Sequence, residues 1–231
     1  MQNLLHNIDW VVVMRSDLLT PVFKSFSALG YGEFLLLFVP ICYWIFNKNI
    51  FARAGLWLLL SALLNMYLKD LFQDPRPDPV FQMDFAVGQS YGFPSGHAQI
   101  AVVIWFWIAW EVRKTWTWIL SSILVVGICF SRLYLGVHDV EDILGGIGIG
   151  LLSLLIFITL TTKRFQWLHN LHFLWKIVGI AVVEFFLFFT WPGKPSGSAI
   201  GYGILLIVFW IGVSVERSWI FFRSNVIGGE L

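Results

Sequence analysis

The feature that most constrains this chain is a series of long apolar runs separated by short polar segments. A helix that crosses the hydrocarbon core of a bilayer needs about 20 mostly apolar residues. Runs that approach this length cover residues 32–47, 51–72, 97–112, 116–136, 142–161, 176–191 and 198–215. Because water is absent at that depth, backbone polar groups must pair within each segment, which favours helices. The sequence therefore predicts an all-α, polytopic transmembrane helical bundle with six to seven spans.

Composition also favours a membrane location. Of the 231 residues, 58% are hydrophobic and 13% are charged, whereas an ordinary soluble domain is about 45–50% apolar and about 25% charged. The formal net charge is +1, which provides no basic surface of the kind that binds nucleic acid. We expect an integral, multi-pass membrane protein whose partners are membrane lipids and not nucleic acid. Nothing in the sequence indicates an oligomeric state.

Residues 1–30 have a different pattern from the rest of the chain. In IDWVVVMRSDLLTPVFKSFSALG, charged residues are mixed with apolar ones, and Pro21 interrupts the stretch. A mixed surface of this kind is typical of a helix that lies in the membrane interface. We predict an N-terminal interfacial helix in residues 1–30, with a tilted span as the alternative, and a transmembrane domain in residues 31–231.

Basic residues predict which ends of the spans face the cytoplasm. They follow alternate spans and fall at one face of the predicted bundle: Lys48, Arg53, Arg113, Lys114, Lys163, Arg164, Arg217 and Arg223. Loops rich in lysine and arginine stay on the cytoplasmic side. The opposite face receives the three polar segments KDLFQDPRPDP, YGFPSGHAQ and SRLYLGVHDVED. We expect a bacterial inner membrane with these segments on the periplasmic side, or, alternatively, an endoplasmic reticulum protein with them in the lumen.

The first polar segment carries two cations, Lys69 and Arg76. Pro75 and Pro77 prevent one helix from continuing through it, so we expect Arg76 on a loop that folds back over the bundle. A flexible ammonium and a planar guanidinium together suit the several oxygens of a phosphate. Taken alone, a lysine that reaches the interface and a solvated arginine explain this segment equally well.

The second polar segment contains the sequence Pro-Ser-Gly-His at the start of an apolar run. Ser95 is placed to cap a helix, and Gly96 would let a ligand approach the backbone. The start of a helix presents free N–H groups and a positive dipole end, which favours anions. His97 would then stand on the first turn beside the anion. The alternative is a capping serine next to an interfacial histidine.

The third polar segment contains Arg132, His138 and Asp142. The last two are four residues apart, which places them on one face of a helix. A carboxylate there can hold the Nδ1 proton of the imidazole and leave Nε2 free for a substrate. Asp139 and Glu141 are expected to be solvated or to interact with the helix dipole, and the alternative for His138 is a self-sufficient His–Asp pair. Together, the three segments indicate phosphoryl transfer.

The order and spacing of these segments resemble the three-part signature of the type 2 phosphatidic acid phosphatase family. The signature Lys-x6-Arg-Pro, Pro-Ser-Gly-His and Ser-Arg-x5-His-x3-Asp is met within residues 69–142. The resemblance implies that His138 is the nucleophile, that Asp142 orients it and that His97 is the general acid and base. It also implies that the phosphate is bound without a metal or cofactor by this set of residues: Lys69, Arg76, Ser95, Gly96 and Arg132.

The resemblance implies a lipid phosphatase that works through a phosphohistidine. Its substrate would be phosphatidic acid, phosphatidylglycerol phosphate, a polyprenyl diphosphate or a sphingoid-base phosphate. Transfer of the phosphoryl group to a lipid or sugar acceptor is one alternative, because a phosphohistidine can be discharged either way. A non-catalytic lipid transporter that only binds headgroups is another, although it would have no need of the His–Asp pair.

Overall fold

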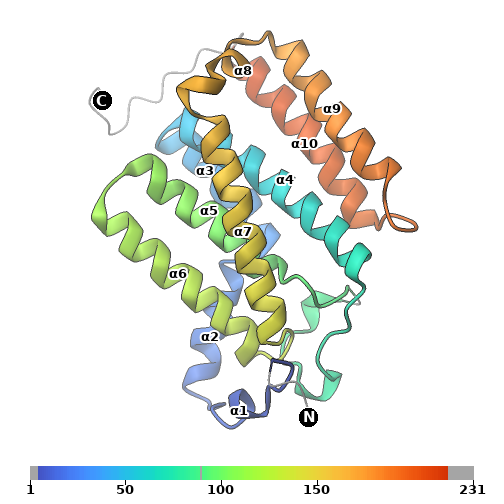
Figure 1. Ribbon diagram of the computed structural model, residues 1–231. Coiled ribbons are helices and arrows are strands. Elements are labelled where there is room, and N and C mark those ends of the chain that lie inside the picture. Colours follow the sequence, from blue (N-terminus) through green and yellow to red (C-terminus); the bar gives the residue numbers. More distant parts are fainter. Residues whose placement is uncertain (1–4, 89, 218–231) are drawn as a thin grey trace.

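The computed structural model describes residues 5–88 and 90–217, and these form helices and loops without any strand (Figure 1). In chain order the α-helices are α1 (Asp9–Val12), α2 (Leu19–Ala28), α3 (Gly32–Ile45), α4 (Lys48–Phe72), α5 (Gly96–Val112), α6 (Thr115–Tyr134), α7 (Val140–Leu160), α8 (Gln166–Asn170), α9 (Phe173–Phe189) and α10 (Gly197–Val215). Three short 3-10 turns also occur: Pro79–Phe81, Phe85–Val87 and Lys163–Phe165. The prediction of an all-α protein is confirmed for the described residues.

Each of the predicted apolar runs corresponds to a helix, namely α3 to α7, α9 and α10. By length and composition, four of the described helices can cross a membrane: α4, α6, α7 and α10. A fifth crossing results if α2 and α3, which meet at a bend of 58°, form one broken span. The apolar helix α5 has 17 residues, which is short for a span. The count of six to seven spans therefore stays a prediction.

The N-terminal helices pack on the bundle. Helix α2 runs along α6, and the ring of Phe23 lies 4.5 Å from that of Tyr134. The predicted boundary at residue 30 falls between α2 and α3. An interfacial position for residues 1–30 stays a prediction, and residues 1–4, like Arg223 in the stretch 218–231, lie outside the described residues.

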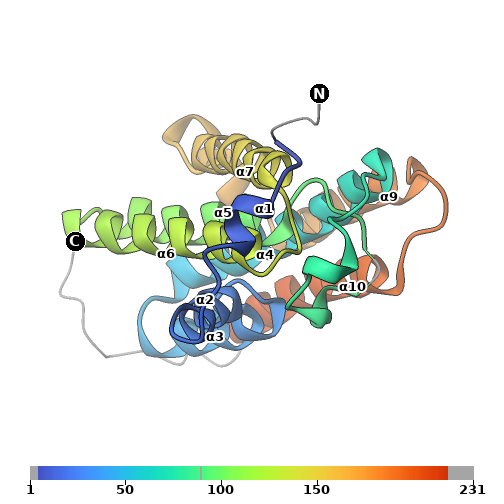
Figure 2. The same cartoon turned by 90° about the horizontal axis from the view of Figure 1, so that it is seen from below.

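Helix α5 lies among α4, α6 and α7 (Figure 2). It is apolar on nearly all sides, as expected for a helix surrounded by others, and Val102, Val103 and Ile104 are fully buried. Two glycines allow α7 to approach it closely. A Cβ at Gly146 would lie 2.5 Å from the backbone oxygen of Ser95, and one at Gly150 would lie 2.8 Å from that of Gln99. Small residues at helix contacts are the usual means of close packing in membranes.

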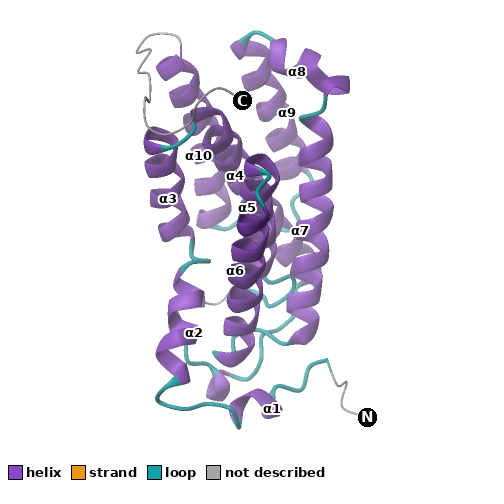
Figure 3. Ribbon diagram, turned by 90° about the vertical axis from the view of Figure 1, so that its left-hand side faces the viewer, coloured by secondary structure: helices purple, strands orange, loops and turns teal. Residues whose placement is uncertain are grey.

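The loops gather at the two ends of the bundle. The α6–α7 connection lies at the same end as α1, and α8 lies at the opposite end (Figure 3). The long segment between α4 and α5 reaches this first end as well, because Met83 N donates to Leu135 O at 2.8 Å just before the α6–α7 turn. The three polar segments that the sequence singles out are therefore next to one another.

Candidate active site

Lys69 and Arg76 fix the loop that joins α4 to α5. Lys69 is buried in the last turn of α4, and its Nζ donates to Tyr91 O at 2.5 Å and to Gly92 O at 2.8 Å. Arg76 follows on the loop, as predicted, and its Nη1 donates to Val137 O at 2.7 Å. Both side chains thus connect the end of α4 to the other polar segments.

The sequence Pro-Ser-Gly-His forms the start of α5, as predicted, but Ser95 does not cap it. Ser95 has the N-cap position, yet its buried Oγ makes no capping hydrogen bond and has no partner among the described residues. Its backbone N–H donates to Asp142 O at 3.0 Å, which joins α5 to α7. The hydroxyl therefore lies beside the first turn of α5 without capping it.

Gly96 has little room for a side chain because α4 packs against it. A Cβ at this position would lie 2.8 Å from Asn65 Oδ1 on α4. Asn65 is buried, and its Nδ2 donates to Pro94 O at 3.1 Å and to Gln99 Oε1 at 2.9 Å. Gln99 in turn donates to the backbone oxygen and hydroxyl of Ser61, both at 3.0 Å. This polar network positions the first turn of α5. Asn65 belongs to none of the three polar segments, so no sequence motif pointed to it.

His138 and Asp142 make the contact that their spacing predicts. Nδ1 of His138 lies 2.8 Å from Asp142 Oδ2, and Nε2 lies 3.2 Å from Arg76 Nη1. Asp139 caps α7 by accepting from Asp142 N at 3.0 Å, so it has the helix-terminal role expected for it, although it is buried. The pKa of His138 lies well below its ordinary value of 6.5, because of burial and then because of the cations Lys69 and Arg76. Its imidazole is therefore neutral at physiological pH.

Arg132 is fully buried and is held by residues that no sequence motif indicates. Its Nη1 donates to Asp84 Oδ2 at 2.9 Å and also to Ser27 Oγ, and its guanidinium lies 5.7 Å from the ring centre of Tyr31. The hydroxyl of Tyr31 donates to Asp84 as well, and its ring packs edge-on against His97 at 4.6 Å. Asp84 could have been suspected from the sequence, because an acidic residue in a loop that enters a membrane bundle is often functional.

Most of the predicted site residues line one cavity of about 640 Å³. The predicted site residues that line it are Lys69, Arg76, Gly96, His97, Arg132 and His138, whereas Ser95 and Asp142 are buried and do not line it. Nε and Nη2 of Arg132 and Nε2 of His97 are buried without a hydrogen-bond partner among the described residues. Buried polar groups are nearly always paired, so these atoms indicate where an anion with several oxygens would fit.

The cavity also has acidic and aromatic walls that the sequence did not indicate. Glu33 at the start of α3 and Asp70 in the last turns of α4 line it, as does Tyr202 of α10. Asp70 is anchored by the indole N–H of Trp191, which donates to its Oδ2 at 2.8 Å. Among the described residues, no group of three or more His, Cys, Asp or Glu side chains could hold a metal ion.

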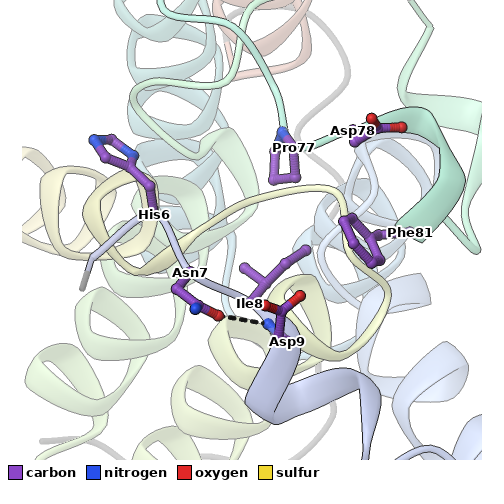
Figure 4. A pocket seen from close by; sticks show the side chains of 7 residues that line it. All are labelled: His6, Asn7, Ile8, Asp9, Pro77, Asp78 and Phe81. Atoms are coloured by element: carbon purple, nitrogen blue, oxygen red, sulfur yellow. Dashed lines mark hydrogen bonds between the residues drawn. The ribbon is translucent and has the colours of Figure 1, made fainter. Parts of the chain in front are cut away.

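A second, smaller hollow of about 230 Å³ lies between the N-terminal segment and the loop after α4 (Figure 4). It is lined by His6, Asn7, Ile8, Asp9, Pro77, Asp78 and Phe81, none of which is a predicted site residue. Nδ1 of His6 lies 2.6 Å from Asp139 Oδ2, and Nε2 lies 3.1 Å from Glu141 Oε2. The segment before α1 is therefore tied to the first turn of α7.

Comparison with known proteins gives a consistent result. Residues 50–166 match the family model described as the PAP2 superfamily. Sphingosine-1-phosphate phosphatase 2 of Mus musculus is 30% identical over 74% of this chain and 50% of its own length. Phosphatidylglycerophosphatase B of Bacillus subtilis is 33% identical over 61% of this chain and 74% of its own length. The chain thus spans about half the length of the sphingosine-1-phosphate phosphatase.

Two solved structures have a similar fold. The transmembrane PAP2 type phosphatidylglycerolphosphate phosphatase from Bacillus subtilis is 27% identical, with a TM-score of 0.60 over 68% of this chain and 85% of that one. Aquifex aeolicus LpxE is 24% identical, with a TM-score of 0.58 over 66% of this chain and 92% of that one. The second likeness concerns the fold alone.

Proposed function

The chain belongs to the PAP2 superfamily, and we propose that it is an integral membrane enzyme that hydrolyses a lipid phosphate or diphosphate. The observation that carries the proposal is the arrangement at His138. Its Nδ1 faces Asp142 at 2.8 Å, while the residue lines a cavity with Lys69, Arg76 and Arg132. A neutral imidazole beside fixed cations suits attack on a phosphate.

The proposed reaction has two steps. In the first, Nε2 of His138 attacks the phosphorus, and the bond from phosphorus to the leaving oxygen breaks as His97 supplies a proton to that oxygen. Asp142 holds the Nδ1 proton and stabilises the positive charge of the phosphohistidine. In the second step, His97 takes a proton from water, the water oxygen bonds to phosphorus, and the bond between nitrogen and phosphorus breaks. Inorganic phosphate leaves and His138 is restored.

Phosphate binding is proposed for the cations and for the start of α5. Lys69, Arg76 and Arg132 would neutralise the oxygens of the phosphoryl group, where negative charge is spread in the transition state. Support comes from three buried polar atoms that have no hydrogen-bond partner among the described residues: Nε and Nη2 of Arg132, and Oγ of Ser95 at the N-cap before Gly96. These cations supply the charge neutralisation that a metal supplies elsewhere, which supports a metal-independent reaction.

We further propose that the cavity opens on the periplasmic side of a bacterial inner membrane and that six to seven helices cross it. Support comes from the basic residues of the opposite end, which include Arg53, Lys163 and Arg217 around one cavity. For residues 1–30, the bend between α2 and α3 supports a broken span as much as an interfacial helix. Labelling of single cysteines introduced at Asn170 and Asp78 with a membrane-impermeant maleimide tests the orientation, since Cys42 and Cys129 are buried.

The substrate is proposed to be one of four lipid classes: phosphatidic acid, phosphatidylglycerol phosphate, a polyprenyl diphosphate or a sphingoid-base phosphate. Phosphate release by the purified protein, with EDTA present, should occur with one or two of them and should disappear in His138→Ala. Transfer to a lipid or sugar acceptor would instead consume the lipid phosphate without releasing phosphate. Lipid movement that survives in His138→Ala would support a transporter.

A radiolabelled substrate tests the intermediate directly. Acid quenching destroys phosphohistidine, so the labelled protein should be denatured in alkali before separation. The label should be absent from His138→Ala. With a substrate whose leaving group needs no proton from His97, the label should persist longer in His97→Ala, which lacks the group that activates water. Label that is retained in His138→Ala would assign the nucleophile to another residue.

A further inference from the structure

We propose that the end of the bundle opposite to the catalytic cavity binds the phosphate group of an anionic membrane lipid. At this end, which α8 marks in Figures 1 and 3, four helices and the segment that follows α7 line a cavity of about 420 Å³. Its walls come from the start of α4, the residues after α7, helix α8, the start of α9 and the end of α10. Segments that are distant in sequence thus form one site.

The charged residues that line this cavity are all cations. Four cations line it: Arg53, Lys163, Lys176 and Arg217. Five neutral residues with amide or hydroxyl groups line it too: Asn49, Thr161, Thr162, Gln166 and Asn170. Among the described residues that form its walls there is no aspartate, glutamate, histidine or cysteine. Such a lining suits the binding of a phosphate. It contains no histidine or carboxylate of the kind proposed to catalyse hydrolysis at the other end.

Several of these side chains are held in place by contacts. Nη2 of Arg217 donates to Asn49 Oδ1 at 3.0 Å, and Nη1 of Arg53 lies 3.1 Å from Oε1 of Glu111. Nζ of Lys176 lies 5.9 Å from the ring centre of Trp210, whose Nε1 has no hydrogen-bond partner among the described residues. Cations that are already ordered lose less conformational entropy when they bind an anion.

The N-terminal ends of α4 and α9 lie at this end of the bundle. Helix α4 begins at Lys48 and α9 begins at Phe173, both within a few residues of cations that line the cavity. The partial positive charge of these N-terminal ends is offset by the C-terminal ends of α7 and α10, which lie at the same end and carry a partial negative charge. The attraction for an anion therefore comes from the side-chain cations.

A lipid fits better than a soluble anion because exposed apolar residues continue along the same helices. On α9, Val178 and Val182 are about half exposed, and on α10 the same is true of Ile211 and Val215. Acyl chains can cover such surfaces while the headgroup meets the cations. Basic pockets between transmembrane helices at the cytoplasmic side bind anionic headgroups in this way.

The test measures the melting temperature of the full chain in detergent. Phosphatidylglycerol should raise it by about 5 °C at saturating concentration, whereas phosphatidylcholine and inorganic phosphate should not. The variant Lys163→Gln/Lys176→Gln should lose this rise. The matched control is Arg113→Gln/Lys114→Gln, which removes two cations from the α5–α6 turn, outside the cavity, and should keep the rise.

Equal rises in both double variants, or equal losses, would overturn the site. An equal rise with inorganic phosphate would show a soluble anion to be enough and would overturn the lipid as ligand. Because binding is read from melting and not from turnover, a negative result leaves the proposed phosphatase untouched. A melting temperature of Lys163→Gln/Lys176→Gln close to that of the parent, measured without added lipid, shows that this variant is folded.

Discussion

Nη1 of Arg132 donates a hydrogen bond to Oδ2 of Asp84 at 2.9 Å, and this contact joins a helix end to a loop that is 48 residues away in sequence. Because Asp84 and Ser27 both accept from Nη1, this nitrogen is fully engaged by protein. The other two nitrogens of the guanidinium, Nε and Nη2, have no hydrogen-bond partner in the part of the chain that the structure describes. Asp84 thus determines which edge of the guanidinium remains for a phosphate.

Replacement of Asp84 tests this positioning role. Asp84→Ala should lower kcat/KM by roughly 10- to 100-fold, because a hydrogen bond to a charged group contributes about 1.5–3 kcal/mol. The effect should appear mainly in kcat if Arg132 binds the phosphoryl group more tightly in the transition state. Asp84→Asn, which retains an acceptor oxygen, should recover part of the loss.

Asp78→Ala is the matched control, since Asp78 lies in the same loop, is exposed and caps the turn Pro79–Phe81. It should leave kcat within about twofold, as surface substitutions usually have small effects. Equal losses in Asp78→Ala and Asp84→Ala would point to a general disturbance of the loop.

The shape of the Arg132 side chain should matter as well as its charge. Arg132→Lys retains the charge but cannot donate to Asp84 and to two phosphate oxygens at once, because lysine lacks the planar fork. We expect a loss of roughly 10- to 100-fold in kcat/KM. Arg113→Lys at the exposed α5–α6 turn should have no effect. Full activity in Arg132→Lys would exclude bidentate binding of the phosphate by this residue.

The close contact between α5 and α7 should depend on Gly146. In Gly146→Ala the new Cβ would lie 2.5 Å from Ser95 O and 3.0 Å from Ala98 Cβ, so the helices must separate. Overpacking of this kind costs about 1–3 kcal/mol, which corresponds to a fall of several degrees in Tm. Activity should fall too, because Asp142 and Ser95 lie on the two helices.

Gly148→Ala in the same helix is its control, since a Cβ there meets no atom of the described residues within 4 Å. Alanine is the better helix former, so Tm should stay the same or rise. If Gly146→Ala and Gly148→Ala melt alike, the contact does not limit the approach of the two helices.

Activity should persist to low pH, because His138 resists protonation. The pKa of His138 is held well below 6.5 by burial and by Lys69 and Arg76, so the nucleophile protonates only when the pH falls through this lowered value. The value of kcat/KM with a good leaving group should therefore stay level as the pH falls through 6.5, the ordinary pKa of histidine. In Arg76→Gln the cation 3.2 Å from Nε2 is gone, and the acid limb of the pH profile should move to higher pH. An unchanged limb would mean that another group titrates there.

His6 should make a small, pH-dependent contribution to stability. Its hydrogen bond to Asp139 raises its pKa above 6.5, so the stabilisation is complete below the unfolded value and is lost as the pH rises through the folded one. The side chain is 46% exposed, and such pairs contribute at most about 1 kcal/mol. The difference in Tm between the parent and His6→Gln should shrink between pH 6 and pH 9. A constant difference would show that the charge of His6 does not matter.

Much of the fold follows from short-range patterns. The apolar runs coincide with helices α3 to α7, α9 and α10, because backbone pairing within a segment and apolar side chains around it decide a membrane helix locally. The His138–Asp142 contact also follows from a local spacing within one helical turn. The capping role of Ser95 was predicted on the same basis and is wrong, since its side chain makes no capping bond.

The count of spans could not be fixed from the same patterns. Helix α5 is apolar yet has 17 residues, and it lies inside the bundle among α4, α6 and α7. The bend of 58° between α2 and α3 joins two helices that the sequence placed in separate domains. Hydropathy reports how apolar a segment is, but its surroundings decide whether lipid or protein covers it.

By itself, the sequence determined the helices, the order of the three polar segments and the spacing of the residues within each. Only the tertiary structure decided that Ser27, Tyr31 and Asp84 gather around Arg132, that Asn65 supports Gly96, and that cations at the opposite end enclose a cavity of their own. The reason is physical. A hydrogen bond within one helical turn is set by neighbours in the chain, whereas a contact between helices depends on how whole faces pack, which no local spacing encodes.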